Sequence, residues 1–147
     1  MYTYENIFFL VGNFWGVASC LLLIAAWLAI YLDKERYERL HRKVMIVMVA
    51  GGWAFVVFYL SGIFLRTAPM TVAAGIVPWI AAHGTIALLT LTGATLLLWA
   101  RLTDRGAGDT VSIRAHLNRR HTLYGRVITP LWFFSHVGGV VNLYLVG

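Results

Sequence analysis

Residues 21–53 read LLLIAAWLAIYLDKERYERLHRKVMIVMVAGGW, and this stretch decides the fold. Two apolar runs flank the eleven residues 33–43, which hold five Lys or Arg side chains and three acidic ones. Each apolar run belongs to a segment long enough to cross a bilayer core of about 30 Å, at about 1.5 Å per helical residue. A basic segment between two such runs is typical of a cytoplasmic turn between membrane-spanning helices.

The same pattern continues along the whole chain of 147 residues, of which 60% are hydrophobic and only 12% are charged. A soluble domain of this length carries about twice that share of charged residues. Membrane-spanning helices are predicted at about residues 7–32, 44–65, 75–99 and 123–146. We therefore expect an all-α integral membrane protein in contact with the lipid bilayer, with residues 1–147 forming one antiparallel four-helix bundle domain.

The distribution of Lys and Arg predicts how the bundle lies in the membrane. Residues 33–43 hold five and residues 101–126 hold six, whereas the connection between the second and third runs holds only Arg66. The positive-inside rule then places loops 33–43 and 101–122 in the cytoplasm and both termini outside. The chain is thus predicted to lie in the cytoplasmic (inner) membrane of a prokaryote. Because the net charge of +6 resides mainly in these two segments, no nucleic acid partner is expected.

The single cysteine, the N-terminal segment and one glycine pattern limit which sites and contacts the chain can form. Cys20 is the only cysteine, so an internal disulfide, a c-type haem and a thiolate zinc site are excluded. The chain begins without a positive n-region or a small-residue cleavage site, so no signal peptide is expected. Gly12 and Gly16 form a GxxxG pattern, which serves either packing inside the bundle or a homo-oligomer through these glycines.

Two histidines, His83 and His136, lie inside apolar runs. An imidazole in hydrocarbon is costly, so it usually faces the bundle interior and has a function there. The third and fourth spans run in opposite directions, which places both histidines about 12–15 Å from the outer surface. Two imidazoles at one depth can hold a flat macrocycle between them or share a metal ion. The alternative is a pair of packed, hydrogen-bonded histidines.

A second histidine pair is expected at the cytoplasmic surface, where His41 opens the second span and His121 the fourth. The alternative is that both belong to a basic interface. At 100° per residue, Tyr59 and Arg66 share the helix face of His41 and point into the same interior. Arg66 is the candidate cation for the propionates of an outer haem, or else an interfacial arginine that snorkels. His116 lies in the polar connection and is expected to be solvated.

Several short motifs fall in a fixed order along the chain. The second run opens with HRKVMI at residues 41–46, and Tyr59 and His83 follow. The fourth run carries a spaced set consisting of His121, Arg126, Pro130, Trp132 and Gly139. This order resembles a small four-helix membrane family of formerly unknown function, which includes CtaM-like maturation factors of haem–copper oxidases. The likeness covers about residues 40–144.

One feature departs from that family's pattern. The family has a further histidine near the end of its second helix, where this chain reads SGIF at residues 61–64. This chain instead carries His136 in the fourth run, where the family has a small or apolar residue. If the family's histidines bind haem or a metal, one ligand has moved between helices here.

These features favour a protein that binds b-type haem through His83 and His136, with a second haem allowed between His41 and His121. It would transfer electrons in a respiratory chain, with a respiratory membrane complex, a quinone or another electron carrier as partner. No carboxylate lies inside a predicted span, so hydrolytic chemistry is not expected. An electron-transfer or accessory subunit is favoured over a stand-alone enzyme.

Two other functions stay open. The resemblance implies an assembly factor for a haem–copper oxidase, which binds haem or copper transiently. Met45 and Met48, beside His41, would suit Cu(I), although methionines also fill ordinary cores. The third hypothesis is a structural membrane subunit without a cofactor, whose histidines make only interhelical hydrogen bonds.

Overall fold

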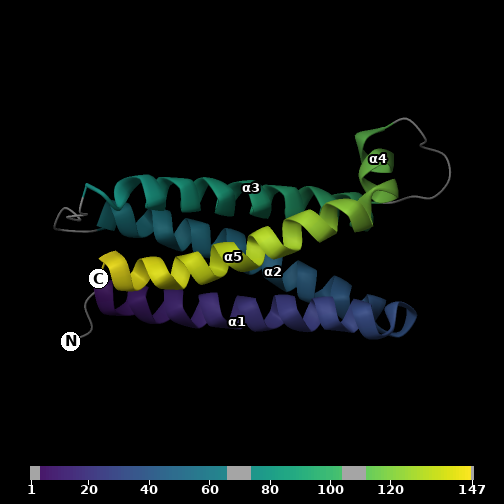
Figure 1. Cartoon of the computed structure of the whole chain (residues 1–147), viewed down its shortest axis with the longest axis horizontal. Helices are drawn as coiled ribbons and strands as arrows, with labels where there is room; N and C mark the ends of the chain where they lie inside the picture. Colours follow the sequence, from purple (N-terminus) through teal and green to yellow (C-terminus); the bar gives the residue numbers. More distant parts are fainter. Residues whose placement is uncertain (1–3, 66–73, 104–111, 147) are drawn as a thin grey trace.

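Five α-helices make up the described part of the chain (Figure 1). The structure, a computed structural model, describes residues 4–65, 74–103 and 112–146. The helices are α1 (Tyr4–Leu32), α2 (Lys34–Leu65), α3 (Val77–Leu102), α4 (Ile113–Arg119) and α5 (His121–Val146). All except α4 are long and apolar enough to span a membrane. The prediction of an all-α chain with four such helices is confirmed for these residues, as expected of a multi-pass membrane protein.

A single residue, Asp33, separates α1 from α2. Its carboxylate accepts a hydrogen bond of 3.0 Å from the backbone N–H of Arg36, so Asp33 caps the first turn of α2. The basic segment 33–43, predicted as the connection between the first two spans, is helical from Lys34 onward and forms the first turns of α2. After the capping aspartate the segment is rich in Lys, Glu and Arg, which favour helix, and it contains no Gly or Pro.

The second predicted loop, residues 101–122, also contains helix. α3 continues to Leu102, and α4 forms a separate short helix. Ser112 is the N-cap of α4, and its hydroxyl accepts a hydrogen bond of 3.2 Å from the backbone N–H of Ala115. A helix of seven residues is too short to show a readable apolar period, which explains why the sequence did not reveal it.

Side-chain hydrogen bonds attach α4 to the end of α3. The Asn118 amide donates to the Ala100 carbonyl at 3.1 Å, and the Arg114 guanidinium donates to the Thr103 carbonyl at 3.0 Å. These bonds satisfy carbonyl groups at the C-terminal end of α3, where helices leave acceptors without intrahelical partners. Two side chains of α4 thus hold this short helix against the C-terminal end of α3.

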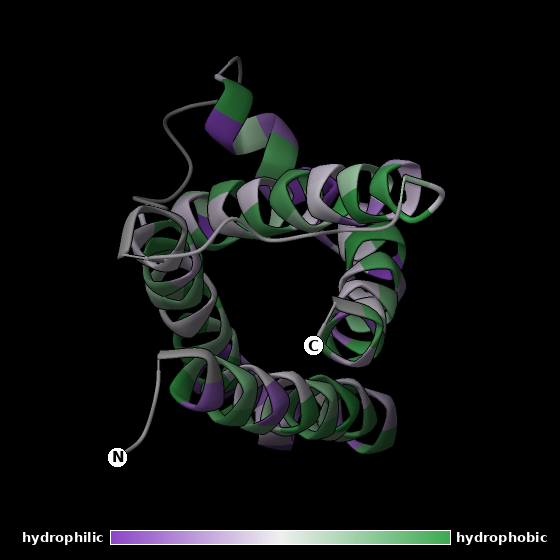
Figure 2. Ribbon diagram, turned by 90° about the vertical axis from the view of Figure 1, so that its left-hand side faces the viewer, coloured by the Kyte–Doolittle hydropathy of each residue, from purple (hydrophilic) through white to green (hydrophobic). Residues whose placement is uncertain are grey.

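The four long helices surround a common interior (Figure 2). α1 packs against α2 and α5, and α3 packs against α5 and, less extensively, against α2. Within the described residues, α1 does not contact α3, and α2 does not contact α5. Side chains that point inward from opposite helices therefore meet in this interior rather than at a helix–helix contact.

A buried apolar cluster fills the interior between the two predicted histidine pairs. It draws on all four long helices, and its buried members are Leu23, Ala26, Val44, Met48, Val49, Leu91, Ala94 and Trp132. Outward-facing positions carry large exposed apolar side chains, such as Phe14, Leu89 and Phe134. Exposed apolar surface of this extent is typical of contact with lipid.

Gly12 and Gly16 lie buried against α5. A Cβ added at Gly12 would lie 2.8 Å from the Cδ1 atom of Leu143, and one at Gly16 would overlap the side chain of Val140. The GxxxG pattern is thus used for close packing inside this chain, and the expected alternative of a homo-oligomer through these glycines finds no support in the structure.

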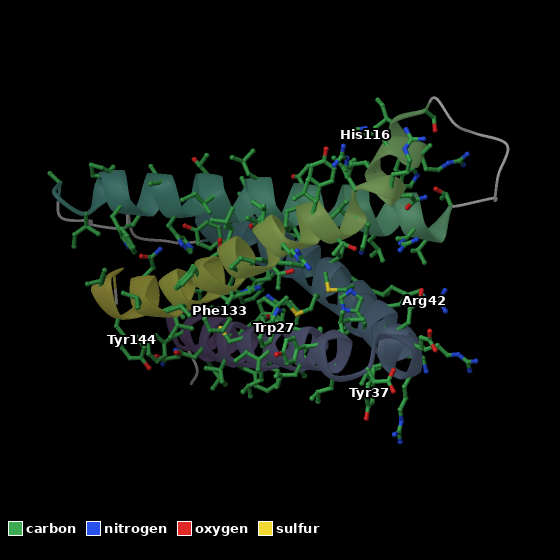
Figure 3. All side chains as sticks on the ribbon, turned by 45° about the vertical axis from the view of Figure 1, so that its right-hand side comes forward. Trp27, Tyr37, Arg42, His116, Phe133 and Tyr144 are labelled. Atoms are coloured by element: carbon green, nitrogen blue, oxygen red, sulfur yellow. The ribbon has the colours of Figure 1, made fainter. Side chains whose placement is uncertain are left out.

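Charged side chains gather at one end of the bundle. Figure 3 shows nitrogen-rich side chains around Arg42 on α2 and near His116 on α4, with Tyr144 of α5 at the other end. The start of α1 and the end of α5 also lie at that other end (Figure 1). The basic residues that the sequence divides between two segments therefore come together on one side of the molecule.

Candidate functional site

His83 of α3 lies directly on the backbone of α5. A Cβ added at Gly138 would come within 2.8 Å of the Nδ1 atom of His83, and one at Gly139 would lie 3.7 Å from its Nε2 atom. Only glycine lets the imidazole approach the helix this closely. The half-buried His83 ring is thus held at the α3–α5 contact.

His136 of α5 lies between two tryptophans. The Trp132 ring stacks on it with centroids 6.1 Å apart and an angle of 28°, and Trp15 of α1 meets it edge-on at 6.3 Å and 81°. Its Nε2 atom is buried and has no hydrogen-bond partner. His83 lies near enough for a charge on one imidazole to act on the other. The structure therefore brings the outer pair together.

The inner pair is arranged differently. The His41 imidazole donates a hydrogen bond to the backbone carbonyl of Ala26 on α1, while its Nδ1 atom is buried without a partner. His121 is the first residue of α5 and is partly buried. The two histidines stand on α2 and α5, whose backbones do not approach each other closely in the described residues.

The remaining predicted site residues lie away from both pairs or outside the description. Tyr59 is 37% exposed, and its ring lies 5.6 Å from that of Phe8 on α1, so it belongs to the α1–α2 contact. Arg66 lies outside the described residues. His116 is exposed, as expected, and its Nε2 atom shares a hydrogen bond of 2.8 Å with the Tyr124 hydroxyl.

The two methionines considered for copper take part in packing. Met48 is fully buried in the apolar cluster, and Met45 packs against that cluster. Across the residues that the structure describes, no three His, Cys, Asp or Glu side chains come together as metal ligands. A bis-histidine haem site needs only two protein ligands, so it would not appear as such a group.

Sequence reasoning missed the residues around the outer pair. Trp15 and Gly138 were not singled out, although they lie against His136 and His83, and neither was Ser19, which is fully buried in α1. Two signals could have revealed them. Ser19 continues the small-residue stripe of Gly12 and Gly16 at helical spacing, and a glycine pair follows His136 by two residues within one helix.

Comparison with known proteins identified no relative of this chain. No family model matches this chain, and no curated protein or solved structure is detectably similar to it. The resemblance to the maturation-factor family accordingly rests on the motifs of the sequence and stays a prediction.

Proposed function

We propose that this chain is a multi-pass membrane protein that binds b-type haem between His83 and His136 and transfers electrons in a respiratory chain. One observation carries this proposal: the Nε2 atom of His136 is buried without a partner in the bundle, close to a second imidazole from a neighbouring helix. Leaving such a group unsatisfied costs about 1–3 kcal/mol. A bond to iron removes that cost.

The surroundings of the two imidazoles suit a flat cofactor. The glycine backbone of α5 supports the His83 ring, and the Trp15 and Trp132 rings offer apolar faces beside His136. Bound haem supplies one-electron redox chemistry, at a potential set by its axial ligands and its burial. The protein residues orient the two imidazoles and exclude water from them.

The proposal includes a second haem site at the basic end. His41 donates one ring N–H to a backbone carbonyl and keeps its other nitrogen buried and unbonded. This is the usual arrangement of a histidine that ligates a metal, because the hydrogen bond fixes the tautomer and the ring orientation. His121 would be the opposing ligand from α5.

We further propose an antiparallel four-helix bundle in the cytoplasmic membrane of a prokaryote, with both termini outside. The gathering of basic side chains near Arg42 and His116 supports the cytoplasmic assignment of that end (Figure 3). In this orientation Arg66 follows α2 at the outer side, where it would meet the haem propionates.

Visible absorption of the purified protein tests the cofactor. We expect a Soret band and, after reduction by dithionite, a sharp α band. His83→Gln and His136→Gln should each abolish or strongly reduce the outer haem signal, whereas the matched control His116→Ala should leave it unchanged. Gel filtration and thermal unfolding of each variant show whether it is still folded. His41→Gln and His121→Gln should lower the haem content per chain without removing the outer signal.

Other results of this experiment would favour one of the two alternative functions. A colourless protein that purifies with stoichiometric copper would refute haem binding and favour the oxidase assembly factor. A folded protein without haem or metal, even after haem is supplied during expression, would favour the structural subunit.

A further inference from the structure

Three polar atoms of α1 and α5 are buried without hydrogen-bond partners: Trp15 Nε1, Ser19 Oγ and His136 Nε2. Ser19 is fully buried, at 0% exposure. The proposed function uses only the histidine. The indole N–H and the serine hydroxyl are therefore left over, and each is costly to bury unpaired.

The helical phase of α1 points Ser19 into the interior. At 100° per residue, Ser19 lies about 40° from Trp15 on one side and about 60° from Gly16 on the other. Trp15 lies on Gly51 of α2, and Gly16 lies on Val140 of α5. Ser19 is thus the residue of α1 that faces between its two neighbouring helices.

The pairing of α1 with α5 places Ser19 at the level of His136. Gly12 faces Leu143, and Gly16 faces Val140, so each step forward along α1 corresponds to about one step back along α5. Continuing by three residues brings Ser19 opposite His136 and its neighbour Val137. The three unpaired polar atoms therefore belong to one region rather than to separate defects of packing.

This region lies deep in the membrane-spanning part of the chain. Ser19 is thirteen residues after Asn6, where the apolar span of α1 begins, which corresponds to about 20 Å along the helix. A ligand that reaches such a site from the bilayer has to be soluble in lipid. An indole N–H can only donate a hydrogen bond, so the ligand has to present an acceptor oxygen.

We infer that Trp15 and Ser19 form a binding site for the carbonyl oxygen of a lipid-soluble quinone, beside His136. A quinone carbonyl supplies the acceptor oxygen that the Trp15 N–H and the Ser19 hydroxyl lack. The inference extends the proposed function by naming the electron carrier and its site. Quinone binding is measured independently of haem, so the experiment can refute the quinone site without refuting haem binding, and the reverse.

The test is quinone binding to the full-length protein in lipid nanodiscs. The probes are a ubiquinone and a menaquinone with one isoprenoid unit each, and retained quinone is compared with that of empty nanodiscs. We expect saturable binding of at least one probe. Ser19→Ala and Trp15→Phe each remove one donor and keep most of the side-chain volume, so each should weaken binding about two- to tenfold.

Matched control substitutions show whether a loss of quinone binding is specific to Trp15 and Ser19. Ser61→Ala removes a hydroxyl that already bonds the Val57 carbonyl, and Trp99→Phe alters an exposed tryptophan. Neither should change the affinity. The inference is overturned if binding does not exceed that of empty nanodiscs, or if folded Ser19→Ala and Trp15→Phe proteins bind as tightly as the unaltered chain. In the latter case the two groups hold only water.

Discussion

At the scale of single residues, three tryptophans at helix contacts differ in whether the indole N–H has an acceptor. Trp79 donates to the Asn142 side chain at 2.6 Å, and Trp53 donates to the Thr95 hydroxyl at 3.0 Å. Both bonds join neighbouring helices, α3 with α5 and α2 with α3. The indole N–H of Trp15 is buried and has no acceptor. This contrast makes Trp15 a candidate for ligand binding rather than for helix packing alone.

Gly138 gives a residue-scale prediction about His83. In Gly138→Ala the new Cβ would lie 2.8 Å from the imidazole Nδ1 atom, so the ring has to turn away from α5. We expect the free energy of unfolding to fall by about 1–3 kcal/mol, as for other overpacked contacts. The α band of the proposed haem should weaken or shift in the same variant. Thermal unfolding and absorption spectra measure the two effects.

Gly125→Ala is the matched control for this change, because it lies in the same helix and a Cβ there meets open space. It should leave the spectrum unaltered and keep or slightly raise stability, since alanine favours helix over glycine. Equal behaviour of the two variants would contradict the close contact between His83 and α5.

The candidate site shows what could be read from the sequence at this scale. His83 and His136 stand out because a polar group in an apolar run is easily recognised, and opposed spans set their common depth. Ser19 and Gly138 matter only through the partner helix that each one faces. That information depends on the rotation and pairing of the helices, which the apolar pattern of a single span does not fix.

At the scale of helices, the apolar runs predicted the four long elements well, but not the polar connections. A span needs a long apolar run, which is a strong signal over about 20 residues. The first turns of α2 and the whole of α4 depend instead on one capping side chain each, Asp33 and Ser112. Such local hydrogen bonds leave only a weak trace in the sequence.

The contact between α1 and α2 gives an element-scale prediction. The six-membered ring of the Trp15 indole lies directly on Gly51, and these rigid ring atoms would overlap an added Cβ. Gly51→Ala should therefore push the helices apart and lower the free energy of unfolding by about 1–3 kcal/mol. Gly84→Ala, where a Cβ meets nothing within 4 Å, is the control.

A double-mutant cycle with Trp15→Leu isolates this contact. Leucine removes the ring that meets residue 51, so Gly51→Ala should cost less in the Trp15→Leu background. We expect a coupling of about 0.5–3 kcal/mol, which is the range for residues in direct contact. Additive effects in thermal or denaturant unfolding would show that the indole does not pack on Gly51.

At the scale of the whole molecule, the four long helices form a ring that encloses a buried interior. The backbones of opposite helices do not approach each other closely in the described residues, and side chains from all four long helices fill the interior between them. The apolar cluster around Met48 and Trp132 separates the level of His136 from the basic end. Two cofactor sites at different depths are compatible with this layered interior.

Cysteine labelling of intact cells tests how the molecule lies in the membrane. In a Cys20→Ala background, Ala74→Cys and Glu38→Cys alter exposed residues, one just before α3 and the other near the start of α2. The positive-inside rule places residue 74 outside and residue 38 in the cytoplasm. A membrane-impermeant maleimide should therefore label the first variant in intact cells and the second only after lysis. The reverse pattern would invert the proposed orientation. Labelling of both from outside would contradict a membrane crossing by α2, because residue 38 lies near its start and residue 74 lies between α2 and α3.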